Sequence, residues 1–125
     1  MSERSGDSID PTAFEVGKHQ VDQAVVLTVS GEVDMLSSPR LAEAIATTLA
    51  TKPSALIVDL SKVSFLASAG MTVLVTAQAE VEAPTKFAVV ANGPATSRPI
   101  KLMGIDSVLA LYSTLDAALN GIAGE

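Results

Sequence analysis

The spacing of apolar positions changes along the chain, and two kinds of spacing alternate. Continuous or alternating apolar runs are typical of strands, whereas apolar residues three or four apart are typical of helices. The predicted strands are Ala13–His19, Val25–Val29, Ala55–Leu60, Phe87–Ala91 and Val108–Leu111. The predicted helices cover residues 38–51, 68–80, 95–103 and 114–122. The order ββαβαβαβα predicts an α/β domain with a small mixed sheet of four or five strands and about four packed helices, the first two strands forming a hairpin at one side.

Polar residues at the predicted helix starts suggest how the helices begin. Ser37 and Ser38 are placed to cap the first helix, and Pro39 suits its first turn. Ser68 stands between a buried strand and the second helix, where its hydroxyl would cap that helix; Thr114 would cap the last one.

The apolar pattern also separates loop from core in two further places. Ser61–Phe65 carries the third predicted strand into a loop, and Met71 and Met103 are expected in the core.

Composition and charge exclude several classes of function. The absence of cysteine and the single histidine, His19, exclude disulfide scaffolds, thiol chemistry, thiolate zinc sites and multi-histidine metal sites. Fourteen acidic against eight basic residues argue against a nucleic-acid or anionic membrane surface. No apolar run approaches the ~18 residues of a membrane span, and Met1–Asp10 has no signal-peptide core. We expect a cytoplasmic protein with a flexible tail at residues 1–10 and one domain at residues 11–125.

Ser68 is the candidate nucleophile, but its surroundings do not favour hydrolysis. A nucleophile elbow needs glycine two residues before the serine, where this chain has Leu66, and His19 lies in a weak strand with no pattern placing it nearby. A serine hydrolase therefore remains a minor alternative. An exposed serine near helix amides and a helix dipole is also a candidate for phosphorylation that would act on a partner.

Two other segments could bind ions, and each has a simpler interpretation. Asn92–Ser97 follows a strand and opens a helix, but it lacks the lysine and spacing of a phosphate loop. Glu32 and Asp34 could share a hard cation, yet no other residue in the pattern supplies the remaining oxygens. We therefore predict no metal, no cofactor and no catalytic residue.

Three segments together resemble a known family. They are Gly31-Glu32-Val33-Asp34, the helix opened by Ser38-Pro39, and the junction from Val58 to Gly70, VDLSKVSFLASAG. In this order they resemble the STAS domains of anti-sigma factor antagonists, and the resemblance runs from about Val25 to Leu119. It implies a STAS-like fold and a non-enzymatic protein that works by partner switching. The antagonist binds an anti-sigma factor, itself a serine kinase of the histidine-kinase-like ATPase fold, and so releases a sigma factor.

The resemblance also assigns roles to residues. It implies that the kinase phosphorylates Ser68, that the complex then dissociates, and that a serine phosphatase restores the antagonist. Ala67 stands where the family pattern commonly has Asp. A phosphorylation-independent scaffold or transport-accessory subunit therefore stays open as an alternative. We expect a monomer or weak dimer. The implied partner-binding residues are Asp34, Ser37, Ser38, Ala67, Ser68, Ala69 and Gly70.

Overall fold

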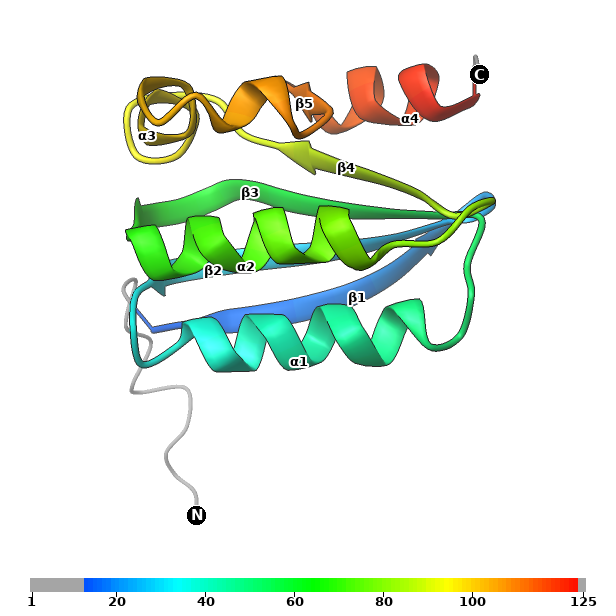
Figure 1. Cartoon of the computed structure of the whole chain (residues 1–125), viewed down its shortest axis with the longest axis horizontal. Helices are drawn as coiled ribbons and strands as arrows, with labels where there is room; N and C mark the ends of the chain where they lie inside the picture. Colours follow the sequence, from blue (N-terminus) through cyan, green and yellow to red (C-terminus); the bar gives the residue numbers. More distant parts are fainter. Residues whose placement is uncertain (1–12, 124–125) are drawn as a thin grey trace.

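The computed structural model describes residues 13–123, so the predicted tail at Met1–Asp10 lies outside the described residues. The strands are β1 (Glu15–Val21), β2 (Ala24–Val33), β3 (Ala55–Leu66), β4 (Lys86–Val90) and β5 (Leu111–Tyr112). The helices are α1 (Ser38–Leu49), α2 (Ser68–Glu80), α3 (Ser97–Leu102), the 3-10 turn η3 (Ile105–Ser107) and α4 (Leu115–Ala123). The predicted order of strands and α-helices and the mixed α/β sheet are confirmed (Figure 1).

The sheet order is β1-β2-β3-β4-β5, and its topology gives the molecule two distinct ends. β1 pairs antiparallel with β2 through a turn at Asp22-Gln23, which confirms the predicted hairpin, and the remaining pairs are parallel. The carboxyl ends of β2, β3 and β4 therefore lie at one edge of the sheet, which we call the carboxyl edge. The opposite edge, where β3 and β4 begin, is the amino edge.

Helices cover both faces of the sheet. One core cluster joins β2, β3 and β4 to α1 and α2, whose buried side chains include Leu41, Ile45, Met71 and Leu74 at helical spacing. A second, smaller cluster lies on the other face under α4, around Ala118. The central strands are buried on both faces because helices cover both, which explains the nearly continuous apolar runs in their first halves.

β3 is longer than predicted. Ser61–Phe65, predicted as a loop, continues the strand to Leu66 and pairs with β2 as far as Val33. β4 pairs with β3 only through Asp59, so the seven residues 60–66 extend beyond β4. Register shifts in β2 and loss of the β4 neighbour leave this part half-exposed, and its sequence no longer shows the apolar run by which the rest of β3 was recognised.

The segment after β4 also differs from the prediction. α3 is shorter, with Pro99 in its first turn, and the strand predicted at Val108–Leu111 is only Leu111–Tyr112. Met103, expected in the core, is exposed. Gly104 turns the chain in a left-handed conformation (φ 73°), so that Ile100 and Leu109 take the buried positions instead.

The cap of α4 is as predicted. The Ala117 amide donates to Thr114 Oγ1 at 3.0 Å.

Candidate functional site

The carboxyl edge brings the two motif segments together. The Ala67 amide donates to Val33 O at 2.8 Å, which joins the end of β2 to the β3–α2 junction. Asp34 follows one partner of this bond and Ser68 follows the other, so residues 34 positions apart in sequence share one surface.

Ser68 does not cap α2, contrary to the structural interpretation of its position. The N-cap is Ala67, which is extended (φ −83°, ψ 168°) and makes no side-chain cap bond. Ser68 is already the first helical residue, one position too late for its hydroxyl to serve the helix amides. Its side chain is exposed, and as in any α-helix the first amides, of Ser68 and Ala69, have no partner within the helix. An exposed hydroxyl therefore stands at the positive end of a 13-residue helix dipole.

Gly70 allows the helix to approach the sheet closely. A Cβ at this position would lie 2.5 Å from Val33 Cγ1 and 2.8 Å from Leu66 Cδ1. Both neighbours are buried core side chains with little freedom to move. The glycine in the Ser68-Ala69-Gly70 motif is therefore required by packing, and it fixes the position of Ser68 over the end of β2.

The β2–α1 loop is folded around the carboxylate of Asp34. Asp34 Oδ1 accepts hydrogen bonds from the amides of Leu36 and Ser37, both at 3.0 Å. Ser37 Oγ accepts from the Asp34 amide at 2.9 Å, and its proton lies within reach of Glu32 O (2.9 Å) and Asp34 Oδ1 (3.1 Å). The amide and the hydroxyl of Ser38 both donate to Asp34 O, at 2.9 and 2.6 Å.

These bonds change the expected roles of the two serines. Ser37 occupies the N-cap of α1 with helical dihedral angles and makes no cap bond, so neither predicted serine cap of α1 forms. Both serine side chains are buried, and they hold the loop rather than face solvent. The Ser37 amide lowers the pKa of the Asp34 carboxyl below its ordinary value, with smaller contributions from the Ser37 hydroxyl and the Leu36 amide, because all three bonds favour the charged form.

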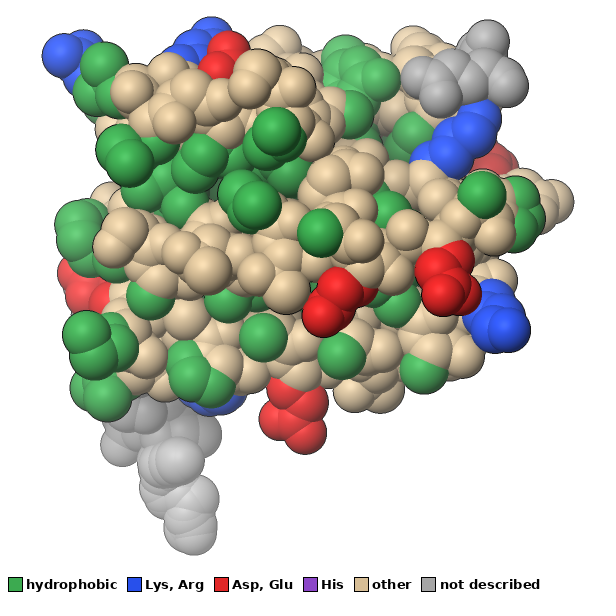
Figure 2. Space-filling view, viewed as in Figure 1, with side chains coloured by type: hydrophobic (Ala, Val, Ile, Leu, Met, Phe, Trp, Pro, Cys, Tyr) green, Lys and Arg blue, Asp and Glu red, His purple; other side chains and the backbone are tan. Residues whose placement is uncertain are grey.

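Large exposed apolar side chains follow the carboxyl ends of the strands, and the sequence analysis missed them. Those among residues 13–123 all lie at the end of β3 or in the connections that follow β2 and β4. Figure 2 shows hydrophobic side chains spread along the end where α2 begins. The signal in the sequence was an apolar pair between Asp34 and Ser37, inside a segment that otherwise looks like a polar loop. The exposed residues are Met35, Leu36, Phe65, Leu102, Met103 and Val108.

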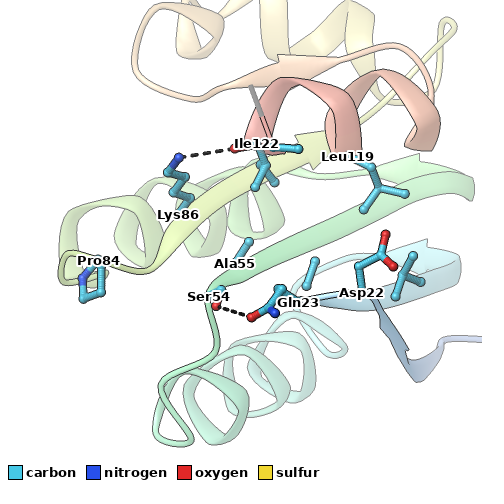
Figure 3. A pocket seen from close by; sticks show the side chains of 11 residues that line it. Asp22, Gln23, Ser54, Ala55, Pro84, Lys86, Leu119 and Ile122 are labelled. Atoms are coloured by element: carbon cyan, nitrogen blue, oxygen red, sulfur yellow. Dashed lines mark hydrogen bonds between the residues drawn. The ribbon is translucent and has the colours of Figure 1, made fainter. Parts of the chain in front are cut away.

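The amino edge has a concave surface instead. A pocket of about 300 Å³ lies between α4, the β1–β2 turn and the first residues of β3 and β4 (Figure 3). Its walls are mostly apolar, with Leu119 and Ile122 of α4 facing Ala55. Lys86 Nζ donates to Ile122 O at 3.2 Å, and Ser54 Oγ lies 3.2 Å from Gln23 Oε1 at the rim.

The polar groups of the two weaker ion-site candidates are already engaged in hydrogen bonds within their own loops. Ser97 Oγ accepts from the Gly93 amide (3.0 Å) and donates to Gly93 O (2.9 Å), so the loop after β4 bonds to itself. Asp34 is engaged as described above, and residues 13–123 contain no group of three or more side chains able to hold a metal ion.

The single histidine of the chain, His19, is remote from Ser68. His19 pairs with Val26, seven residues before Val33 along β2, which is about 23 Å from the end of the strand. It is therefore not placed to serve Ser68 as a base.

No helix within residues 13–123 is both long and apolar enough to cross a membrane.

Comparison with known proteins identifies similar chains. Residues 15–118 match the STAS domain family. The chain is 44% identical over 114 residues to the anti-sigma-F factor antagonist RsfB of Mycobacterium tuberculosis, covering 91% of this chain and 93% of that protein. It also resembles an anti-sigma factor antagonist from Mycobacterium paratuberculosis whose crystal structure is known. The two sequences are 42% identical, and the structures superpose with a TM-score of 0.87 over 91% of this chain and 97% of the other. The unphosphorylated form of the antagonist SpoIIAA shares the fold, with a TM-score of 0.69, 19% identity, and 90% and 98% of the two chains covered.

Proposed function

Since this chain belongs to the STAS-domain family of anti-sigma factor antagonists, we propose that it binds an anti-sigma factor through its carboxyl edge and so releases a sigma factor. The partner is a serine kinase of the histidine-kinase-like ATPase fold, and the switch is phosphorylation of Ser68, reversed by a serine phosphatase. The protein is a regulator rather than an enzyme, and it acts in the cytoplasm, where sigma factors meet RNA polymerase. The observation that carries this proposal is the exposed Ser68 hydroxyl. It makes no helix-capping hydrogen bond, and it lies at the carboxyl edge, where large apolar side chains are exposed.

A phosphate on Ser68 is compatible with the folded chain but weakens binding to a partner. The group would add about −1.5 to −2 charges beside the free amides of Ser68 and Ala69, which favour an anion. A partner surface that matches a neutral hydroxyl would instead meet a buried charge. Such a mismatch weakens binding by about 100-fold or more, because a few kcal/mol of affinity are lost. The switch therefore requires no refolding of the antagonist.

The other residues of the site position the surface around Ser68. Asp34, Ser37 and Ser38 hold the loop that exposes Met35 and Leu36 to a partner. Around Ser68, Ala67, Ala69 and Gly70 have small side chains that leave the serine hydroxyl accessible to a kinase.

One sequence feature favours a second candidate. The family pattern commonly has Asp at the position of Ala67, and a carboxylate there would help to orient the hydroxyl or contact the kinase. A phosphorylation-independent scaffold or transport-accessory subunit would bind its partner through the same edge. Its affinity would be indifferent to a negative charge at position 68.

The test combines intact-mass measurement with binding. The full chain is incubated with ATP and each purified anti-sigma factor of its host, with Ser68→Ala in parallel, and we expect one phosphate on the parent chain and none on the variant. In calorimetric titrations without ATP, Ser68→Ala should bind like the parent chain, and Ser68→Glu should bind about 100-fold more weakly. Ser54→Glu adds the same charge at the amino edge and serves as the matched control, with unchanged binding expected.

The outcomes separate the candidates. Equal binding by Ser68→Glu and the parent chain, with no phosphate added, would leave the phosphorylation-independent scaffold. If no anti-sigma factor of the host binds, the proposed function is wrong.

A further inference from the structure

The segment from α3 to η3 has more large apolar side chains than it can bury. Ile100 and Leu109 are buried, and Ile105 packs partly buried against the main core cluster. Three others point into solvent, with exposed fractions of 73% for Leu102, 64% for Met103 and 54% for Val108. We call these three residues the α3 ridge. They lie within seven residues of the sequence, and exposed apolar side chains that gather in one segment are typical of protein interaction sites.

The ridge is held in place by the backbone beneath it. The Met103 amide donates to Pro99 O and the Gly104 amide to Lys101 O, both at 3.0 Å. In η3, the Val108 amide donates to Ile105 O at 2.9 Å. A surface ordered before binding loses little conformational entropy when a partner docks.

The charge around the ridge is opposite to that of the whole chain. Residues 97–108 carry Arg98 and Lys101 against Asp106, a net charge of +1, whereas the chain carries −6. All three charged side chains are exposed. The chemistry that matches this surface is an apolar segment flanked by acidic side chains. A second copy of this chain is disfavoured, because two ridges would face each other with like charges and two acidic bodies would repel.

The position of α3 connects the ridge to the site already described. α3 follows β4 at the carboxyl edge, at the end of the molecule where α2 begins and the β2–α1 loop turns (Figure 1). A partner that covers Ser68 can therefore reach the ridge in the same complex.

Taking the proposed function as its basis, we infer that the α3 ridge is a second docking surface for the anti-sigma factor and accepts an apolar, acidic segment of that protein. The ridge contributes affinity independently of the state of Ser68. It is therefore the part of the interface that a phosphate does not disrupt directly, and the phosphorylated chain keeps a weak contact with its kinase.

The experiment measures the affinity of the full chain for the purified anti-sigma factor by calorimetry. The double variant Leu102→Ser with Met103→Ser removes apolar surface without adding charge, and it should weaken binding at least 10-fold with little change in the melting temperature. Lys101→Glu should weaken binding and reduce its dependence on salt, since a charge attraction is lost. Lys52→Glu reverses an exposed charge at the opposite end and should bind like the parent chain.

Ser68→Glu, measured beside the ridge variants, separates this inference from the proposed function. If the ridge and Ser68 act independently, the fold-losses of Ser68→Glu and the double serine variant multiply when the changes are combined. If Ser68→Glu weakens binding and the ridge variants bind like the parent chain, the ridge inference is wrong and the proposed function stands. If the ridge variants weaken binding and Ser68→Glu does not, the ridge stands and the phosphorylation switch falls. Dimers of the parent chain that the ridge variants dissociate would assign the ridge to self-association and overturn the inference, and failure of every anti-sigma factor to bind would overturn both proposals.

Discussion

The two edges of the sheet treat apolar side chains in opposite ways. At the amino edge, Leu119 and Ile122 of α4 turn inward and form the wall of a pocket. At the carboxyl edge, Met35, Leu36 and Phe65 stand in solvent with no covering element among the described residues. Both edges belong to one small domain with one sheet, so the difference does not arise from composition alone. The difference arises from the segments that connect the strands. At the amino edge, α4 packs over the apolar side chains. At the carboxyl edge, the loops are stabilised by their own hydrogen bonds, and their apolar side chains stay exposed.

The comparison suggests that stability and recognition are separated along the strands. Substitutions at the amino edge should change the free energy of unfolding and leave partner binding unchanged. Exposed side chains at the carboxyl edge should show the reverse, while the backbone contacts that support them should affect both properties.

The largest effect is expected for Gly31→Ala, which acts on the backbone of the carboxyl edge. Gly31 has a φ of 87°, and a Cβ there would collide with the carbonyl oxygen of Ala13. We expect a loss of about 3 kcal/mol in the free energy of unfolding, measured by urea denaturation. Gly93→Ala is the matched control, because Gly93 also has a positive φ (115°) but open space around its Cβ position. Equal losses for the two variants would show that the dihedral strain matters and the Ala13 contact does not.

A smaller effect is expected for Ile122→Asp, which tests the amino edge directly. This half-buried side chain packs against the second core cluster, so a carboxylate there should cost about 1 to 2 kcal/mol of unfolding free energy without changing affinity for the anti-sigma factor. Leu36→Asp is its counterpart at the carboxyl edge. It should change stability by no more than about 0.5 kcal/mol and weaken partner binding. If Ile122→Asp weakens binding in proportion to stability, the two properties are not separated.

The smallest effect is expected for Asp34→Asn and concerns acid stability. The pKa of Asp34 is lowered in the folded chain from the ordinary value of 3.8, so its hydrogen bonds stabilise the fold fully above that value and are lost as the pH falls below it. Chemical denaturation between pH 7 and pH 2 should therefore show a weaker decrease in stability for the variant than for the parent chain. A variant curve parallel to that of the parent over this range would contradict the role given to the Asp34 carboxylate.

The sequence predicted best those elements whose environment is uniform. The runs at Val25–Val29 and Ala55–Leu60 are buried on both faces, so apolar residues fill nearly every position, with Thr28 and Asp59 as the exceptions. Thr114 caps α4 as expected because a cap is a local interaction. The order of elements, and with it the mixed sheet, followed from these signals.

The wrong predictions concern the carboxyl edge, where contacts with neighbouring elements determine the local structure. Ser61–Phe65 forms a strand only because β2 extends beside it, and no local pattern reveals that neighbour. Ser68 does not cap α2 because Ala67 takes the N-cap, which depends on its bond to Val33. Met103 is exposed because the turn at Gly104 gives the buried position to Leu109. Departures from local rules that gather in one region are typical of functional surfaces.

The extension of β3 beyond β4 has a consequence for how such proteins diverge. Residues 60–66 pair with β2 alone, so the β2–α1 loop and the start of α2 are supported by the outer part of the sheet rather than by its five-stranded centre. Leu60, Val63 and Leu66 of this overhang belong to the core. Its exposed side chains, among them Ser61, Lys62 and Phe65, lie outside the core, so changes among them disturb few packing contacts. Duplicated copies of the gene could therefore accumulate different surfaces there while keeping the same body, and each copy could acquire its own partner without losing the ability to fold.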